Sequence, residues 1–245
     1  MKARLIFCFL FIITVCVTGQ TLIGIKTGIN LTDYRDTKID ETFYGTPSYA
    51  FGVDIKGRKD KGRSTAIHIG TSVEYLRNSF NWNGPNNSGA LGDQTSSGLN
   101  VHYTVEWLRL SLYPELVWGR RFQVNFNFSP FVSFKIHASK NGTSWTTDAQ
   151  GRTTTQIETG SAADDFYKID VGFREELGFS YKVLPWLALS LEENYSLGIA
   201  TVNKVTEEFL KTKSLCVFFC TSFIIPTKKL KNAGKENHPP RQSTN

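Results

Sequence analysis

The segment RFQVNFNFSPFVSFKIH, Arg121–His137, decides the fold. Every even position in it is apolar, and every odd position from Gln123 onward except Phe131 is polar. An alternation of period two is typical of a β-strand with one apolar face and one polar face. The run is longer than the usual strand of about 5–6 residues, and about 9–11 tilted residues suffice to cross a bilayer. We therefore expect a chain built from membrane-spanning strands.

Residues 1–19 have the composition of a secretory signal peptide. Lys2 and Arg4 precede a mostly apolar core, Leu5–Val17, which is too short to cross a bilayer core of about 30 Å as a helix. Small residues before Gln20 indicate cleavage at that point. The mature chain is therefore expected to be exported.

The net charge of +6 lies at the two ends of the chain. The signal peptide carries two of these charges and the tail Thr227–Asn245 carries four, so the body from Gln20 to Pro226 is neutral. The basic composition consequently gives no indication of nucleic-acid binding. The tail has no apolar periodicity, contains Pro239-Pro240, and is predicted to be a disordered basic tail, residues 227–245.

Seven further segments alternate in the same way: Thr21–Thr32, Ser48–Lys56, Thr65–Leu76, Leu99–Tyr113, Phe166–Lys182, Trp186–Gly198 and Lys213–Ile225. The connections are alternately long (Asp33–Pro47, Arg77–Gly98, Ala138–Ala163, Ile199–Lys211) and short (Gly57–Arg63, Pro114–Arg120, Val183–Pro185). An even number of strands with long loops at one end is typical of outer-membrane barrels. We predict an all-β fold, an eight-stranded antiparallel up-and-down transmembrane β-barrel over residues 20–226.

Three irregularities interrupt the pattern. The apolar set changes phase after Trp107, which predicts a one-residue bulge near Trp107-Leu108 and places the apolar side chains of Val101–Trp107 on the outside. Pro130 lacks an N–H group and predicts a second bulge. Glu175 and Glu193 interrupt the apolar face.

The size of the side chains separates a membrane barrel from the alternative, a soluble lipocalin-like barrel or sandwich with an apolar interior. The apolar face carries Phe, Tyr, Ile and Leu, whereas the other face is mostly Gly, Ser, Asn and Thr. The lumen of eight strands holds only side chains, so the small polar face fits it better. Tyrosines expected in the interfacial girdles are Tyr49, Tyr75, Tyr103, Tyr113, Tyr181 and Tyr195.

Four segments resemble the PorT-like outer-membrane β-barrels of the OmpX/OmpA-type barrel group. They are IGIKTGINLT at Ile23–Thr32, VEWLRLSLYPEL at Val105–Leu116, FSPFVSF at Phe128–Phe134 and LSLEENYSLGI at Leu189–Ile199. The chain departs from that family at Leu108, where Pro is usual, at Ser129, where Gly is usual, and in its tail after the last strand. The resemblance implies an integral outer-membrane protein.

Ten charged residues are expected to face the lumen, five basic and five acidic: Lys26, Asp54, Lys56, Glu74, Glu106, Arg109, Lys135, Arg174, Glu176 and Glu192. Buried charges have to be paired. We expect an ion-pair plug that fills the lumen, and the alternative is a narrow conducting or gated lumen.

A site at the outer rim is a separate hypothesis. His102 and His137 are expected to point inward near the rim, beside Lys168 and Asp170, where they could bind a metal ion or hydrolyse a substrate. No metal-ligand spacing and no base–nucleophile pair supports such a site. Polar lining is the favoured interpretation, and the sequence predicts no catalytic, cofactor-binding or metal-binding residue.

The predicted function is that of an integral protein of the Gram-negative outer membrane, with a plugged polar lumen and long extracellular loops. Its role is structural, or accessory to secretion or surface interaction, and it is not expected to be an enzyme or to use a cofactor. Expected partners are outer-membrane lipid and lipopolysaccharide, the barrel-assembly machinery, and secretion or surface proteins, but not nucleic acid. The alternatives are a barrel enzyme with a rim site and a soluble periplasmic binding barrel.

Overall fold

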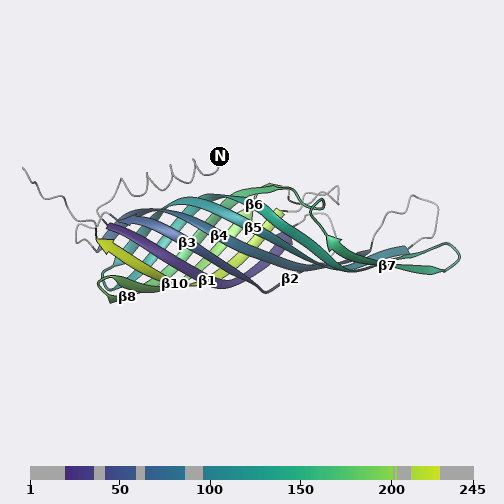
Figure 1. The fold of residues 1–245 in the computed structure, drawn as a ribbon, viewed down its shortest axis with the longest axis horizontal. Coiled ribbons are helices and arrows are strands. Elements are labelled where there is room, and N and C mark those ends of the chain that lie inside the picture. The colour runs from purple at the N-terminus through teal and green to yellow at the C-terminus, as the bar shows by residue number, and fades with distance from the viewer. Residues whose placement is uncertain are drawn as a thin grey trace, which may run out of the picture.

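The computed structural model describes residues 20–35, 42–58, 64–85, 96–200, 202 and 211–226. Within them the chain forms ten strands (Figure 1): β1 (Gln20–Arg35), β2 (Thr42–Thr46), β3 (Ser48–Arg58), β4 (Thr65–Pro85), β5 (Ser96–Gly119), β6 (Phe122–Thr147), β7 (Thr153–Ser161), β8 (Ile169–Leu184), β9 (Leu187–Gly198) and β10 (Lys211–Pro226). The predicted signal peptide and the predicted tail lie outside the described residues.

The sheet closes on itself. The order β4-β3-β1-β10-β9-β8-β6-β5 runs once around, and β5 pairs with β4 to complete the ring. All these pairings are antiparallel, and β1 pairs along its whole length with β10. A closed ring leaves no open edge in the membrane, where unpaired backbone groups would be costly. The predicted eight-stranded barrel is therefore confirmed, and each predicted strand lies in one of its walls.

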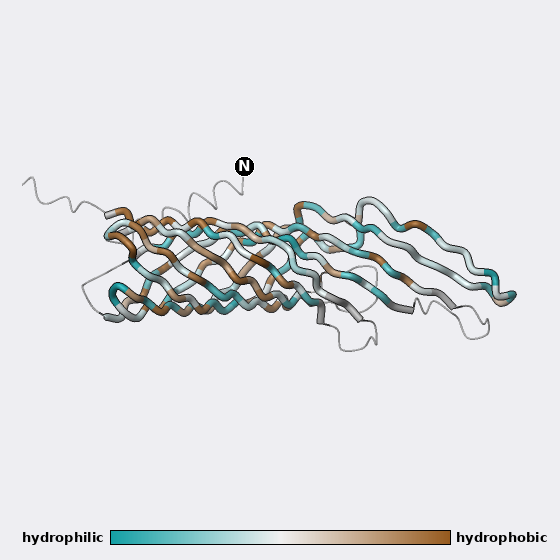
Figure 2. The backbone as a smooth tube through the Cα atoms, turned by 90° about the horizontal axis from the view of Figure 1, so that it is seen from below, coloured by the Kyte–Doolittle hydropathy of each residue, from teal (hydrophilic) through white to brown (hydrophobic). Residues whose placement is uncertain are grey.

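The alternation of β6 corresponds to two environments. From Gln123 to Ser133 the odd residues are buried in the lumen, while Phe126, Phe128 and Phe134 are exposed on the outside. The other barrel strands alternate in the same way, so apolar and polar residues follow one another along the tube in Figure 2. The barrel is thus mainly polar inside and apolar outside, as the side-chain sizes predicted, except where buried apolar side chains gather inside it.

The two ends of the barrel differ. At one end of the barrel, β5 and β8 finish and the next strand begins after only two residues. The first residue of β1 and the last residue of β10 lie at this same end. We call this the turn end, at the left of Figure 1, and the opposite end the loop end. At the loop end β4, β5 and β6 continue well beyond the barrel, and β2 and β7 pair with them. Among the described residues no helix is both long and apolar enough to span a membrane.

Residues 138–163, predicted as the longest loop, are mostly strand. β6 runs on to Thr147, turns through an Asp148–Arg152 hydrogen bond, and returns as β7. This segment is rich in Thr, Ser and Gly and carries no apolar face, so period-two patterning could not reveal it. The result is a sheet extension, β2-β4-β5-β6-β7, that projects from the loop end.

The predicted phase change in β5 is wrong, although a bulge does occur there. The odd residues Val101 to Trp107 are buried inside the barrel, in phase with Arg109 and Tyr113, so β5 never changes face. The register shift lies opposite, on β6, whose partners to Glu106 and Trp107 are His137 and Lys135. Ile136 is the extra residue of the bulge. The sequence pattern changed because the lumen itself becomes apolar near the loop end.

Pro130 is accommodated without a bulge. It pairs with Phe173 of β8, and the register between β5 and β6 is the same on either side of it. Pairing with β5 is interrupted between Ser111 and Glu115, so no ladder hydrogen bond is required of the proline there. The second predicted bulge is therefore replaced by a local gap in pairing.

Candidate functional site

Lys26 lies at the centre of the lumen. Its Nζ is 3.3 Å from Glu74, 3.6 Å from Glu176 and 3.4 Å from Glu192, and all four side chains are almost completely buried. These residues come from β1, β4, β8 and β9, on different sides of the barrel. One ammonium group therefore connects four walls across the axis.

A second ammonium group lies next to the first. Lys56 Nζ is 2.7 Å from Glu115, 3.2 Å from Asp54 and 3.5 Å from Glu192, so Glu192 is shared between the two lysines. His68 Nδ1 lies 3.0 Å from the other oxygen of Glu115. Sequence reasoning placed Glu115 in a turn, because Pro114 precedes it, but β5 continues to Gly119. The signal that could have found it is the in-phase spacing from Arg109.

Two arginines extend the network toward the loop end. Arg174 Nη1 donates to Glu74 at 2.5 Å, and its Nη2 is 3.4 Å from Glu176. Arg109 donates to Ser133 at 3.2 Å and to Ser196 at 3.0 Å. These contacts join β4, β5, β6, β8 and β9, so the network resists a shift in strand register.

Aromatic rings fill the remaining space around the cations. The guanidinium of Arg109 lies 4.0 Å from the ring centre of Phe131, and that of Arg174 lies 5.2 Å from Tyr113. Lys26 lies 5.4 Å from Phe218. Tyr113 was expected in an interfacial girdle, but it is buried in the lumen and its ring occupies the space left by Gly70. The middle of the lumen is therefore occupied by side chains.

Nine of the ten predicted lumen charges face inward, and eight of these are buried. Glu106 is the exception, because it is half-buried on the outside. Lys135 lies on the inward face beside Trp107, is half-buried, and donates to the carbonyls of Ala163 and Phe166. With Glu115 and Asp170 included, the described residues bury six carboxylates and four Lys or Arg groups in the lumen. The predicted balance of five to five is thus wrong.

Neutral side chains compensate the excess of carboxylates. Asn127 and Asn194 donate to Glu176 at 2.9 and 3.5 Å, and Asn125 donates to Glu115 at 3.3 Å. Thr212 donates to Asp170 at 2.7 Å. Hydrogen bonds to charged groups are the stronger kind, so these amides and hydroxyls belong to the network as much as the cations do.

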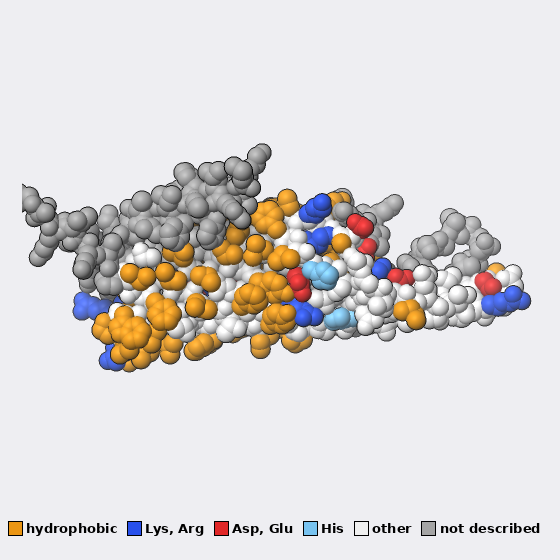
Figure 3. Space-filling model, in the orientation of Figure 1, with side chains coloured by type: hydrophobic (Ala, Val, Ile, Leu, Met, Phe, Trp, Pro, Cys, Tyr) orange, Lys and Arg blue, Asp and Glu red, His pale blue; other side chains and the backbone are white. Residues whose placement is uncertain are grey.

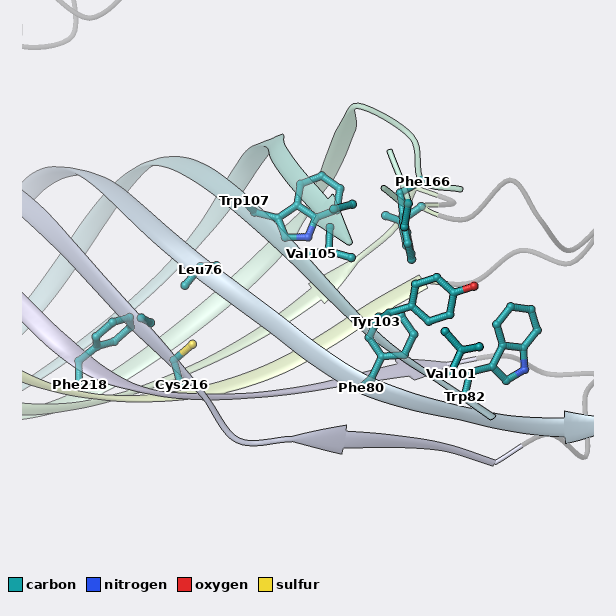
Figure 4. Close-up of a cluster of buried hydrophobic side chains, with 14 of the residues drawn as sticks. Leu76, Phe80, Trp82, Val101, Tyr103, Val105, Trp107, Phe166, Cys216 and Phe218 are labelled. Atoms are coloured by element: carbon teal, nitrogen blue, oxygen red, sulfur yellow. The ribbon is translucent and has the colours of Figure 1, made fainter. Parts of the chain in front are cut away.

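An apolar cluster closes the lumen above the charges, at the loop end (Figure 4). Phe80 stacks on Tyr103 at 5.3 Å between ring centres, and Phe166 packs edge-on against Tyr103 at 5.6 Å. Val101, Val105 and Trp107 of β5 complete this part of the cluster. Tyr103, like Tyr113, therefore does not belong to a girdle, whereas Tyr49 and Tyr181 are exposed on the outside as predicted.

The predicted rim site does not assemble. His137 is exposed on the outside next to the bulge, and His102 points outward with its Nδ1 2.7 Å from Asn81 Oδ1. Asp170 alone faces the lumen, and Lys168 is exposed. The described residues contain no group of three or more His, Cys, Asp or Glu that could hold a metal ion. Cys216 and Cys220 are free and buried.

The outside of the barrel is an apolar belt. Exposed apolar side chains cover it from Phe122 to Ile136 on β6 and from Ile169 to Val183 on β8. Glu175 and Glu193 do face outward within it, as the sequence indicated. In the view of Figure 3 the belt stops at a band of charged and histidine side chains, beyond which the extension carries mostly neutral polar residues.

A closed sheet with such a belt is the architecture of outer-membrane proteins, because its interior and its ends are polar while the band between them contacts lipid. The chain is an outer-membrane β-barrel. Its strands cross the membrane, and its extension lies beyond the belt on the loop side.

Comparisons with known proteins return no matching family model and no matching curated protein. Solved structures with a similar fold include Ail, the attachment invasion locus protein of Yersinia pestis, in complex with the heparin analogue sucrose octasulfate (7% identity, TM-score 0.39, 84% of this chain and 100% of that chain). OprG from Pseudomonas aeruginosa (11%, 0.43, 86% and 97%) and the protease OmpT from Escherichia coli (8%, 0.34, 85% and 95%) are also similar. Because the similarity is low, the function has to be argued from this barrel's own geometry.

Proposed function

We propose that this protein is a PorT-like outer-membrane barrel that holds a rigid polar sheet at the cell surface. Its role is structural, or accessory to secretion or surface interaction, and it does not conduct solutes. The lipid and lipopolysaccharide around the belt and the barrel-assembly machinery are its expected general partners. The specific partners are surface or secretion components that meet the extension.

The observation that carries the proposal is the length of the paired strands beyond the belt. From His137 to Thr147, β6 continues for ten residues, about 33 Å at 3.3 Å per residue, with β5 on one side and β7 on the other over much of that length. A connection that only joined two strands would need a few residues. The long pairing of β6 with β5 and with β7 instead supports a preformed binding surface.

The filled lumen supports the other half of the proposal. Lys26, Glu74, Arg174 and Glu176 meet near the barrel axis with no exposed side-chain surface. Above them the apolar cluster closes the loop end. This packing of the described side chains supports a lumen without an aqueous path, in keeping with the limited interior of eight strands.

Two measurements on the full chain test the proposal. In planar lipid bilayers the purified protein is expected to show no steady conductance at any voltage that the bilayer tolerates. On intact cells, a protease site inserted at Gln150, between β6 and β7, is expected to be cut by externally added protease. Steady conductance, or a site that is protected until the cells are broken, would contradict the proposal.

A further inference from the structure

One face of the extension carries no formal charge. It continues the outside of the barrel beyond the row formed by Arg77, Glu106 and His137. Successive rows across β4, β5, β6 and β7 contain Ser79, Thr104, Ser139 and Ser161, then Asn81, His102, Asn141 and Thr159, then Asn83, Asn100, Thr143 and Ile157, then Gly98, Trp145 and Thr155, and finally Thr147 and Thr153. We call this set the outer face. Apart from His102 it has no titratable side chain.

The indole of Trp145 covers Gly98 on the outer face. A Cβ atom on Gly98 would lie 2.4 Å from the ring, so the ring covers the space that this glycine leaves empty. Trp145 nevertheless keeps 39% of its surface exposed, and Ile157 keeps 76%. A large aromatic surface held in place on a flat sheet is a preformed stacking platform.

The side chains around this platform are those that best match hydroxyl groups. His102 is hydrogen-bonded to Asn81 at 2.7 Å, and Thr159 donates to Asn141 at 3.1 Å, so hydrogen bonds between neighbouring strands already order the second row. Each amide and each hydroxyl can both donate and accept. A sugar ring presents the same combination, with hydroxyl groups at its edge and C–H groups on its face.

The ion-paired charges of the extension lie on the opposite face. There the Nζ of Lys140 is 3.1 Å from Glu158 and 3.6 Å from Asp165. Residues on one strand alternate between faces, so the separation of charged from neutral side chains is a property of the sequence. The outer face offers no cation to bind an anionic ligand. A neutral ligand can bind there without removing any charged side chain from water.

We propose that the outer face binds the neutral polysaccharide of the glycolipid that surrounds the barrel in the same leaflet. The inference rests on the proposed function and names the ligand of its surface. The outer face follows the apolar belt along β4, β5 and β6, with only the row of Arg77, Glu106 and His137 between them. A glycolipid whose acyl chains contact the belt therefore extends its sugars along this face. Trp145 supplies the stacking surface, and the Asn and Thr rows supply the hydrogen bonds.

Binding is measured with the full chain in detergent micelles, by quenching of tryptophan fluorescence and by isothermal calorimetry. The probe is the neutral polysaccharide released by mild acid from the cell's own lipopolysaccharide, with dextran and a sulfated polysaccharide as comparators. Trp145→Ala is expected to weaken binding about tenfold, a typical loss for a tryptophan anchor. Trp145→Phe is expected to keep most of the affinity, and Thr146→Ala, on the opposite face, all of it.

Three results would overturn the inference: no binding of the released polysaccharide, an affinity unchanged in Trp145→Ala, or equal or tighter binding of either comparator. The folded state of each variant is verified by its altered gel mobility without heating. The proposed function is tested separately by conductance and by protease access at Gln150. A chain that is accessible and non-conducting but binds no polysaccharide loses the inference and keeps the proposed function.

Discussion

Replacing Lys26 by Met tests whether the lumen is closed. The ammonium lies 3.3–3.6 Å from three carboxylates, and at an effective dielectric constant near 20 each contact corresponds to about 5 kcal/mol of Coulomb attraction. Most of this is offset by the cost of removing the charges from water. Without Lys26 the three carboxylates retain only Arg174 and Lys56 as cationic partners. Losing one partner of a buried ion pair costs about 3–5 kcal/mol. We expect Lys26→Met to lower the free energy of unfolding by that amount.

The assay is urea unfolding in lipid vesicles, followed by tryptophan fluorescence and by the fraction of protein that migrates as folded without heating. A matched double variant, Lys26→Met with Glu192→Gln, is expected to recover part of the loss, because one of the three carboxylates that lost this cation no longer carries a charge. A loss below about 1 kcal/mol in the single variant would refute the reasoning, since the ammonium would then behave as an exposed partner in water.

Three further perturbations test other parts of the structure. Gly70→Ala places a methyl group 2.5 Å from the ring of Tyr113. It is expected to lower the free energy of unfolding by about 1–3 kcal/mol in the same assay. An unchanged stability would show that the lumen is loosely filled. Glu193→Leu, on the lipid face, is expected to stabilise the barrel by about 1–2 kcal/mol, whereas Glu176→Leu in the lumen destabilises it by about 3–5 kcal/mol; equal effects would contradict the assigned faces. The hydrogen bond from its lysine partner lowers the pKa of Glu158, so this pair contributes fully above the ordinary carboxyl pKa of about 4.3 and is lost as the pH falls below it. Hydrogen exchange of the β6–β7 amides, corrected for intrinsic rates, should then lose about 0.5 kcal/mol of protection between about pH 5 and pH 3, and Glu158→Gln should abolish that pH dependence.

The barrel could be predicted from the sequence because the two faces of each strand lie in different environments. Lipid outside and packed polar side chains inside require opposite polarity at alternate residues. The alternating burial from Gln123 to Ser133 shows this pattern. The same alternation predicted which charged residues face the lumen. Lys26, Arg174 and Glu176 were placed correctly without any knowledge of their partners.

The parity argument failed where one of the two environments changed. Near the loop end the lumen is apolar, so the inward residues Val101 to Trp107 resemble lipid-facing ones, and the apolar pattern changed phase although the strand did not. The extension failed for the opposite reason. Both of its faces are polar, so Thr143 and Thr146 give no alternation and only backbone pairing shows that they belong to a strand.

The orientation of two neighbouring residues on β6 tests the central claim most directly. Single spin labels at Phe126 and Asn127 are compared in vesicles, in a background with Cys216 and Cys220 replaced by Ser, for collision with oxygen dissolved in lipid and with a water-soluble nickel chelate. The structure predicts high oxygen accessibility at 126 and low accessibility to both reagents at 127, which lies inside the filled lumen. A label at 126 shielded from oxygen, or one at 127 in contact with lipid, would contradict the polar-inside barrel.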